Sequence, residues 1–586
     1  CGAIGVMLAG WYALDPAAAE IRPAGPDAGD PGGVLARLGP DGSRARVLPV
    51  LTVSPAGPTT PLAAPARARL AEGVARLVAD TGYAGLCIDI GDPAFAALFA
   101  DIGHRLALMQ RQTCLVTSIQ SAVWREAAVQ DAADLVVLRA FAEVSPDTPQ
   151  APLAAQPWFE ENVADAVATL GAGRLVIALG SFGLDWQAGH PLPEVIGYCE
   201  AMRRAARHQG QIDLAPDVLN TRVHWADDQG NRHLIWLLDA VSLRNQRSVL
   251  ARYPLAGVAI WPLGLEDPGS WAAMALDPPQ ALQSVALRDY VGHDGQGPFM
   301  QVTQTDRIGQ RRLALDAASG LIVRQSYGPV PQPYAMRRFG AGKDDMVVLT
   351  FDDGPDARYT LEILDILREK SVPAAFFVIG SSLLETPGLV RRMVAEGHEV
   401  GSHTFFHPEI ETISGLRLRL ELNALQRLLG SITGPGTALF RPPYGRGEGP
   451  LTAAEAQPFL ALDVGGYLAV GSNIVPPDWR DLGPQEIVDT VLAQLAPEGG
   501  NVITLHDGGG DRSATVVALP LLIDALRARG YRFVPLAAML GVGPEVVMPV
   551  ERGLRVTLDR LSFAALGGLG ALLRGIFWLT IGAGLL

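Results

Sequence analysis

The sequence predicts an α/β protein with an N-terminal (β/α)8-like barrel, a second α/β domain and a C-terminal transmembrane helix. In the first half, short apolar runs alternate with helical stretches, which is the pattern of parallel βαβ units. In the second half, carboxylates and histidines follow apolar runs, and catalytic residues of α/β folds collect at such strand ends. A chain of 586 residues exceeds one typical domain, so two or three domains are expected.

The first domain is expected to span residues 1–285. Its strands are predicted at residues 47–53, 84–90, 114–119, 135–139, 175–178, 234–238 and 258–261, a number that suits a (β/α)8 barrel. The cysteines show no Cys-x-x-Cys spacing, so we expect buried thiols and no disulfide framework: Cys1, Cys87, Cys114 and Cys199.

Two of these strand segments, residues 83–91 and 257–264, resemble strands of family 18 glycoside hydrolases. That family ends one strand with aspartates at alternate positions and a glutamate that protonates the glycosidic oxygen. Here Cys87 replaces an aspartate, Gly91 replaces the glutamate, and Asp92 is displaced by one residue. Without the acid, glycoside cleavage loses its proton donor. We therefore expect a non-catalytic barrel that binds glycan or acts as a spacer.

Residues 286–339 are rich in glycine, glutamine and turn residues between short apolar stretches, which predicts a small β connector. Residues 340–542 are expected to form the second domain. Its apolar run at residues 346–351 ends directly at Asp352 and Asp353, so both carboxylates should lie at the end of a strand.

Five short segments of this second domain contain the residues that a metal-dependent hydrolase needs. They are residues 350–356 (TFDDGPD), 402–408 (SHTFFHP), 441–445 (RPPYG), 477–479 (PDW) and 503–507 (ITLHD). A divalent cation that polarises a carbonyl group and activates water requires anionic or imidazole ligands, open coordination positions, and a separate base and acid. The five segments supply all of these.

Taken singly, the segments have ordinary explanations. Asp-Asp-Gly-Pro is also a common solvated turn. Histidines four apart, such as His403 and His407, often only cap or pack. They share one face if their segment is helical, and they follow a predicted strand at residues 399–402.

In this order and spacing, the five segments resemble the polysaccharide deacetylases of carbohydrate esterase family 4, the NodB-like family. The resemblance implies a distorted (β/α) barrel that removes acetyl groups from N-acetylglucosamine units of a polysaccharide. It implies that Asp353, His403 and His407 bind a divalent metal ion, with Zn2+ the expected ion.

The resemblance also implies the acid and base. Asp352 would be the general base, and Arg441 would hold it ionised. His506 would be the general acid, and Asp478 would orient it and keep it cationic.

The substrate contacts follow from the same resemblance. The backbone N–H of Tyr444, placed by the turn at Pro442 and Pro443, would stabilise the tetrahedral oxyanion. Trp479, Leu505 and Pro443 would line the substrate pocket.

Three of these residues have structural alternatives that the sequence leaves open. Arg441 could be a surface cation, Trp479 a core aromatic residue, and Asp478 the cap of a helix at residues 482–495.

The charge of the chain limits its partners. A formal net charge of -14 disfavours nucleic acid and polyanionic polymers, because both would be repelled. The leading hypothesis, which the resemblance implies, is metal-dependent N-deacetylation of an acetylated amino-sugar polysaccharide. Two alternatives stay open, a non-catalytic glycan-binding protein and a bifunctional chitinase and deacetylase.

Residues 561–586 are almost wholly apolar, with Arg574 as their single charge, and are long enough to cross a bilayer. We expect a transmembrane segment there, preceded by a juxtamembrane linker at residues 543–560; an interfacial helix or a helix packed on another domain is the alternative. The protein is then expected to be anchored in a membrane and to act outside the cytoplasm. The domain order resembles bacterial proteins that continue into a family 2 glycosyltransferase, which implies a truncated chain and a possible glycosyltransferase domain or partner.

Overall fold

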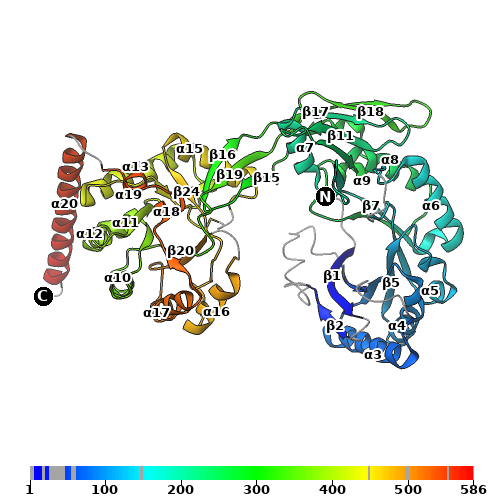
Figure 1. Cartoon of the computed structure of the whole chain (residues 1–586), viewed down its shortest axis with the longest axis horizontal. Helices are drawn as coiled ribbons and strands as arrows, with labels where there is room; N and C mark the ends of the chain where they lie inside the picture. Colours follow the sequence, from blue (N-terminus) through cyan, green and yellow to red (C-terminus); the bar gives the residue numbers. More distant parts are fainter. Residues whose placement is uncertain are drawn as a thin grey trace. The chain divides into compact units, whose positions relative to one another are not determined.

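The computed structural model describes most of the chain as two compact units (Figure 1). The N-terminal unit comprises Cys1–Leu287 and Arg307–Gln332, and the C-terminal unit comprises Arg288–Asp306 and Pro333–Leu586. The residues described are 6–15, 20–24, 46–53, 61–144, 150–445, 449–496, 500–550 and 554–584.

The N-terminal unit is built on an eight-stranded sheet in the order β13-β7-β6-β5-β4-β3-β1-β2. All neighbours in it pair in parallel except β1 and β2, which are antiparallel. The strands are β1 (Val6–Asp15), β2 (Glu20–Pro23), β3 (Arg46–Val53), β4 (Gly85–Asp89), β5 (Gln112–Ser118), β6 (Leu135–Arg139), β7 (Leu175–Gly180) and β13 (Gly257–Trp261).

Helices connect and cover these parallel strands, with α3 to α6 lying along the outer side of the sheet (Figure 1). Their buried faces carry leucine, valine, alanine and phenylalanine side chains that belong to one core with the strands. The helices are α3 (Ala64–Thr81), α4 (Ala96–Leu108), α5 (Ala127–Ala132), α6 (Gln156–Leu170), α8 (Ala240–Leu250) and α9 (Ser270–Met274).

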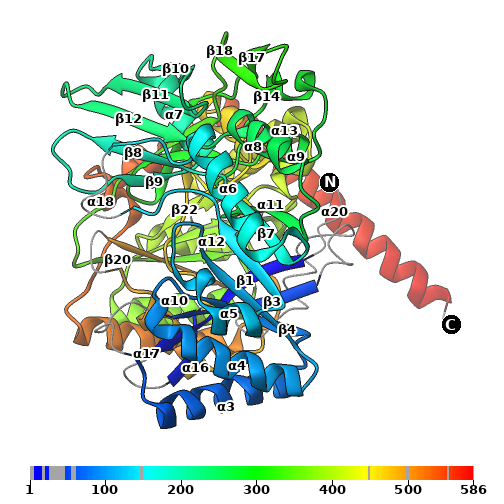
Figure 2. The same ribbon diagram turned by 90° about the vertical axis from the view of Figure 1, so that its right-hand side faces the viewer.

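Two smaller sheets complete this unit. One has the order β10-β11-β12-β8-β9 and packs against α7 (Tyr198–Arg207). The other has the order β14-β17-β18, and its hairpin lies beside β10 and α8 in both ribbon views (Figures 1 and 2). Their strands are β8 (Gly183–Gln187), β9 (Glu194–Ile196), β10 (Gln211–Leu214), β11 (Thr221–Ala226), β12 (Arg232–Leu237), β14 (Ser284–Val285), β17 (Gly309–Leu315) and β18 (Ile322–Tyr327).

The prediction of a (β/α)8 barrel is wrong. The strand predicted at residues 234–238 is β12, which pairs with β11 and β8 in the separate antiparallel sheet. Among the described residues, β13 pairs only with β7, so the large sheet is not closed by strand pairing. A short apolar run looks the same in a parallel and in an antiparallel sheet, and for this reason the sequence misplaced the strand.

The C-terminal unit holds a ten-stranded sheet in the order β15-β19-β16-β24-β23-β22-β21-β20-β25, with β26 also paired to β20. From β24 to β25 every neighbouring pair is parallel. The strands are β15 (Val291–Gly295), β16 (Phe299–Gln304), β19 (Tyr334–Phe339), β20 (Met346–Asp352), β21 (Ala374–Val378), β22 (Glu399–Ser402), β23 (Leu439–Phe440), β24 (Leu468–Val470), β25 (Asn501–His506) and β26 (Arg532–Phe533).

Most residues of the parallel strands of this sheet are buried, and their apolar side chains form one core with the covering helices. The covering helices are α10 (Tyr359–Lys370), α11 (Gly380–Glu385), α12 (Pro387–Ala395), α13 (Gly415–Thr433), α14 (Ala453–Ala456), α15 (Phe459–Val464), α16 (Pro484–Gln494), α17 (Ser513–Ala528), α18 (Leu536–Met539) and α19 (Pro544–Val547). The path of named strands runs from β15 to β25, and an isolated parallel bridge pairs Ile474, after β24, with Ile503 of β25. In place of the expected distorted barrel, the unit has this mixed sheet.

The segment predicted as a connector, residues 286–339, contributes to both units. Strands β15, β16 and β19 extend the sheet of the C-terminal unit, whereas the hairpin of β17 and β18 belongs to the N-terminal unit.

The predicted transmembrane helix is also wrong, since no helix in the described residues is long and apolar enough to cross a membrane. Helix α20 (Leu554–Gly584) begins before residue 561, and its first turns carry charges. Asp559 is buried and pairs with Arg427 of α13, so the start of α20 packs on the C-terminal unit.

Candidate active site

The candidate residues of the C-terminal unit meet at one edge of its parallel sheet. Asp352 ends β20 and lies opposite His506, the last residue of β25. His403 directly follows β22, which is joined to β20 through β21. Parallel strands end at a common edge, so residues far apart in sequence come together there.

Asp353, His403 and His407 form a group whose ligand atoms all lie within 4.8 Å of one another. Nε2 of His407 is 3.0 Å from Oδ1 of Asp353, and Nε2 of His403 is 3.4 Å from the same oxygen. Burial opposes ionisation of Asp353, but hydrogen bonds from both histidines hold its pKa well below the usual range.

Tight turns bring these three residues together, and the segment of the two histidines is not helical as considered above. Asp353, Thr404 and His407 have positive φ angles of 73°, 65° and 59°. The hydroxyl of Thr404 accepts a hydrogen bond from the backbone N–H of His407 at 3.0 Å. The two imidazoles therefore converge because of this turn and not because of helical spacing.

The donor set fits a divalent metal ion. Nδ1 of His403 lies 2.8 Å from the backbone carbonyl oxygen of Arg441, so in a neutral imidazole Nδ1 carries the proton and Nε2, on the side of Asp353, can bind a metal ion in place of its hydrogen bond to Asp353. Two imidazole nitrogens and one carboxylate oxygen are a common ligand set of catalytic zinc sites. Such a set leaves a coordination position for substrate.

Asp352 is held by a buried arginine. Nη1 of Arg441 donates to Oδ1 of Asp352 at 2.8 Å and to the hydroxyl of Thr350 at 2.7 Å. The guanidinium lies 4.2 Å from the ring centroid of Phe377. Burial lowers the pKa of Arg441 while Asp352 opposes that shift, and arginine remains protonated in proteins. Arg441 is therefore not a surface cation.

His506 is oriented by Asp478. Nδ1 of His506 lies 2.7 Å from Oδ1 of Asp478, and the backbone N–H of His506 donates to Oδ2 at 2.9 Å. Burial alone would lower the pKa of His506, but the hydrogen bond and charge of Asp478 raise it above its ordinary value. Gly483, not Asp478, stands at the start of α16, so the capping alternative does not apply.

Tyr444, expected to stabilise the oxyanion, and the three residues expected to line the substrate pocket differ in exposure. Tyr444 is 69% exposed, and its ring lies 4.4 Å from that of His407. Trp479 is 46% exposed and contacts the ring of His506 at 5.1 Å, so it is not a core residue. Pro443 is buried, and Leu505 is packed in the core of the sheet.

The sequence assigned no role to Asp507, which lies beneath the Asp353 turn. Its Oδ2 accepts a 2.5 Å hydrogen bond from Thr360, whose oxygen accepts one from the backbone N–H of Asp356. Burial raises the pKa of Asp507 to about 7, with the charges of Asp352 and Asp353 adding to the shift. The sequence feature that could have revealed Asp507 is a carboxylate directly after a buried strand.

Glu421 was missed as well, because its only sequence context is an amphipathic helix. This buried residue of α13 accepts hydrogen bonds from the backbone N–H groups of Phe405 and Phe406 at 2.9 and 2.8 Å. It fixes the loop that presents His407.

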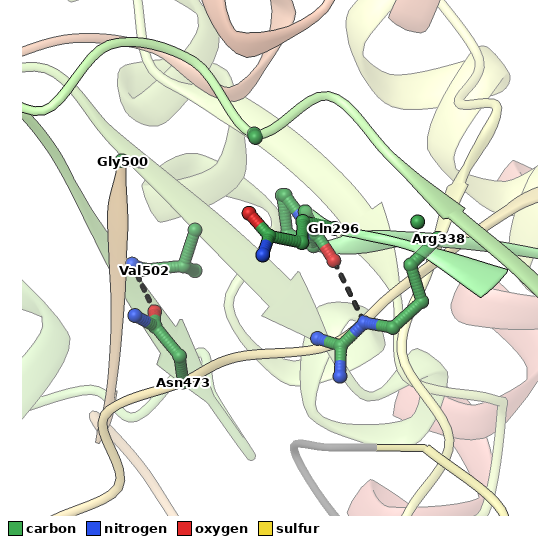
Figure 3. Close-up of a pocket in the computed structure, with 9 residues that line it drawn as sticks. Gln296, Arg338, Asn473, Gly500 and Val502 are labelled. Atoms are coloured by element: carbon green, nitrogen blue, oxygen red, sulfur yellow. Dashed lines mark hydrogen bonds between the residues drawn. The ribbon is translucent and has the colours of Figure 1, made fainter. Parts of the chain in front are cut away.

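A cavity of about 230 Å³ lies away from these residues (Figure 3). Gly500 and Val502, near the start of β25, line it, whereas His506 ends that strand. Arg338 donates to the carbonyl oxygen of Gly297 at 2.9 Å across its wall, and Asn473 accepts from the N–H of Val502 at 2.7 Å. None of the candidate active-site residues lines this cavity, so it is not part of the candidate active site.

Comparison with known proteins places the same region in a family. The family model for polysaccharide deacetylase matches residues 340–457. The chitooligosaccharide deacetylase of Sinorhizobium fredii is 39% identical over 205 residues, which cover 33% of this chain and 91% of the relative. A peptidoglycan-N-acetylglucosamine deacetylase of Bacillus cereus is 36% identical over 202 residues, covering 34% and 89%.

Among solved structures, the peptidoglycan deacetylase PdaC from Bacillus subtilis is 30% identical, with a TM-score of 0.30 and coverage of 34% of this chain and 92% of its own. The family match falls within the C-terminal unit and includes Asp352, Asp353, His403, His407 and Arg441. Because the two curated relatives are matched over nearly their full length, the chain is an enzyme of the polysaccharide deacetylase family.

Proposed function

We propose that this enzyme is a metal-dependent N-deacetylase that removes acetyl groups from N-acetylglucosamine units of a polysaccharide and uses Zn2+. One observation carries the proposal. Asp353, His403 and His407 converge at a strand edge where Asp352 and His506 end neighbouring strands. A ligand set, a base and an acid are therefore within one site, as hydrolysis of an amide requires.

A divalent ion bound there would supply Lewis acidity that polarises the acetamide carbonyl and makes water more acidic. The carboxylate of Asp352, paired with Arg441, accepts a proton from the attacking water. The oxygen of that water bonds to the carbonyl carbon, and the backbone N–H of Tyr444 donates to the resulting oxyanion. His506 then donates a proton to the nitrogen as the C–N bond breaks, which releases acetate and a free amine.

Asp478 sets the orientation and the protonation of His506 for this step. Its carboxylate accepts from Nδ1, so the opposite nitrogen, Nε2, carries the proton that is donated. The hydroxyl of Thr515 donates to the second oxygen of Asp478 at 2.8 Å and fixes its orientation.

We propose an acetylated amino-sugar polymer as the substrate. The named relatives act on chitooligosaccharide or on peptidoglycan N-acetylglucosamine, and both contain the N-acetyl group that this site would cleave. The net charge of -14 favours a neutral glycan over a polyanion. We propose in addition that the enzyme acts outside the cytoplasm and works with a glycosyltransferase that makes the polymer.

For the N-terminal unit we propose a non-catalytic role like that of a degenerate family 18 domain, holding or spacing the glycan. Asp89, at the end of β4, pairs with Arg139 at 2.7 Å. Gly91 carries no side chain, and a Cβ added there would meet nothing within 4 Å. Thus a glycine with open space stands where that family has its proton donor, and the aspartate two residues before it is held in an ion pair.

Acetate release from a panel of acetylated oligosaccharides tests the function. The purified chain should release acetate, lose this activity after treatment with a chelator and regain it with Zn2+. Full activity after chelation would contradict metal dependence, and no release from any amino-sugar oligomer would contradict the substrate class.

A further inference from the structure

Phe406 is a large apolar side chain that lies at the surface beside a proposed metal ligand. It is 62% exposed and directly precedes His407. Phe405, its other neighbour, is partly buried and packs on the core of the unit. An exposed aromatic ring is unremarkable by itself, so its neighbours decide whether it belongs to a binding site.

The backbone under Phe406 is fixed before any ligand arrives. Glu421, whose side chain is buried, accepts hydrogen bonds from the N–H groups of Phe405 and Phe406 at 2.9 and 2.8 Å. The N–H of His407 is held by Thr404 at 3.0 Å. A ring presented by a fixed loop loses little conformational entropy when it binds, which favours recognition.

A cation lies beside the ring. The guanidinium of Arg417, in the first turn of α13, is 5.8 Å from the ring centroid of Phe406. Its Nε donates to Glu421 at 2.6 Å, so one buried carboxylate positions both the loop and the arginine. Arginine has five N–H donors, and those on its two terminal nitrogens can donate to hydroxyl oxygens of a ligand.

We infer that Phe406 and Arg417 form a subsite for a sugar ring next to the one that is deacetylated. The apolar C–H face of a pyranose ring would stack on Phe406, while its hydroxyl groups would accept hydrogen bonds from Arg417. This inference rests on the proposed function and adds that the enzyme prefers a chain over an isolated sugar.

The position of the subsite fits this role. Tyr444 contacts the ring of His407, and Trp479 contacts that of His506, so these two exposed aromatic residues flank the reacting group. Phe406 directly precedes His407 in the same loop, so its backbone is held next to a proposed metal ligand. In this inference, the sugar on Phe406 is therefore the neighbour of the reacting sugar within the same oligomer.

The test compares β-1,4-linked N-acetylglucosamine oligomers of two and of five units. For Phe406→Ala, the ratio of kcat/KM on the pentamer to that on the dimer should fall roughly threefold to tenfold, through a higher KM on the pentamer. Phe406→Trp should keep the ratio, and Arg417→Gln should lower it. Val464→Ala, at a 90% exposed position of α15, is the matched control and should leave the ratio as it is.

Metal content of Phe406→Ala is measured alongside, and it should equal that of the wild type. An equal loss on both oligomers, a loss of metal, or an unchanged ratio would each overturn the subsite. If the wild-type chain releases no acetate from either oligomer, the proposed function fails, and the subsite fails with it.

Discussion

At the scale of single residues, each reactive group of the site is held by one partner that fixes its charge or its tautomer. The carbonyl of Arg441 fixes His403, the guanidinium of Arg441 fixes Asp352, and Asp478 fixes His506. Arg441 therefore contacts His403 through its backbone carbonyl and Asp352 through its side chain. Substitutions at these positions should therefore separate metal binding, base function and acid function.

Replacing a proposed ligand should remove metal and activity together. His403→Ala takes one imidazole from a three-residue set, and we expect the purified variant to lose its metal ion while the unit stays folded, because the ligands lie on loops. Metal analysis measures the metal content, and circular dichroism measures whether the unit stays folded.

The control is His104→Ala, which replaces a surface histidine of α4. One equivalent of metal retained in His403→Ala would contradict the assignment.

Replacing the proposed base should leave the metal in place. Asp352→Asn keeps the size of the side chain but removes its basicity, so turnover should fall on the order of a hundredfold or more. Acetate release is the measurement, with metal content as the control. Activity close to that of the wild type would mean that another group accepts the proton.

The proposed role of His506 as the general acid predicts how activity depends on pH. His506 must be protonated to donate, so activity should fall as pH rises through its pKa, which Asp478 raises. Asp478→Asn removes that carboxylate and should move the alkaline limb of kcat/KM to lower pH. An alkaline limb that does not move would show that it belongs to a different group.

At the scale of elements, one buried ion pair joins the hairpin of β17 and β18 to the rest of the N-terminal unit. Arg311 of β17 pairs with Asp267, and both side chains are 0% exposed. Arg311 also donates to the hydroxyl groups of Tyr198 and Tyr327 at 3.0 and 2.9 Å. The hairpin therefore docks through charge and hydrogen bonds as well as through apolar contact.

Breaking this pair should destabilise the N-terminal unit. Arg311→Met leaves the carboxylate of Asp267 buried without its cation, which costs about 3–5 kcal/mol. Urea unfolding followed by tryptophan fluorescence reports this unit, because most tryptophans lie in it. The double variant with Asp267→Asn should recover part of the loss; equal stability of Arg311→Met and wild type would contradict the prediction.

At the scale of the whole molecule, the two units should differ in catalysis. The full chain should release acetate but should not cleave chromogenic chito-oligosaccharides, because Gly91 offers no proton donor and Asp89 is paired with Arg139. Reducing-end assays on the same preparation measure glycoside cleavage, which is then compared with acetate release. Glycoside turnover that disappears in Asp89→Asn or Asp92→Asn would contradict a non-catalytic N-terminal unit.

The sequence located the candidate site far better than it located the boundaries of the fold. Charged residues after apolar runs predicted the strand ends at Asp352, His403 and His506, because buried parallel strands leave a strong local pattern. Sheet closure depends on pairing between distant strands, which local pattern does not encode, so the barrels were wrong. The apolar character of residues 561–586 likewise did not reveal that α20 starts earlier and docks through Asp559.

Asp507 and Glu421 were missed for a related reason. Each acts on a segment that is distant in the sequence, Asp507 through the hydroxyl of Thr360 and Glu421 through backbone N–H groups, and neither has a partner at a fixed spacing. Only the folded arrangement shows that a carboxylate supports each ligand loop.

The chain passes between the two units three times, after Leu287, after Asp306 and after Gln332. A single protease cut at any one passage would give two fragments, at least one of which carries a segment that packs in the unit of the other, so the fragments would stay associated without a covalent link. Exchange of one unit by recombination at a single junction would separate either the hairpin of β17 and β18 or strands β15 and β16 from the unit in which they pack. Neither unit is therefore one continuous stretch of chain, unlike domains joined by a simple linker.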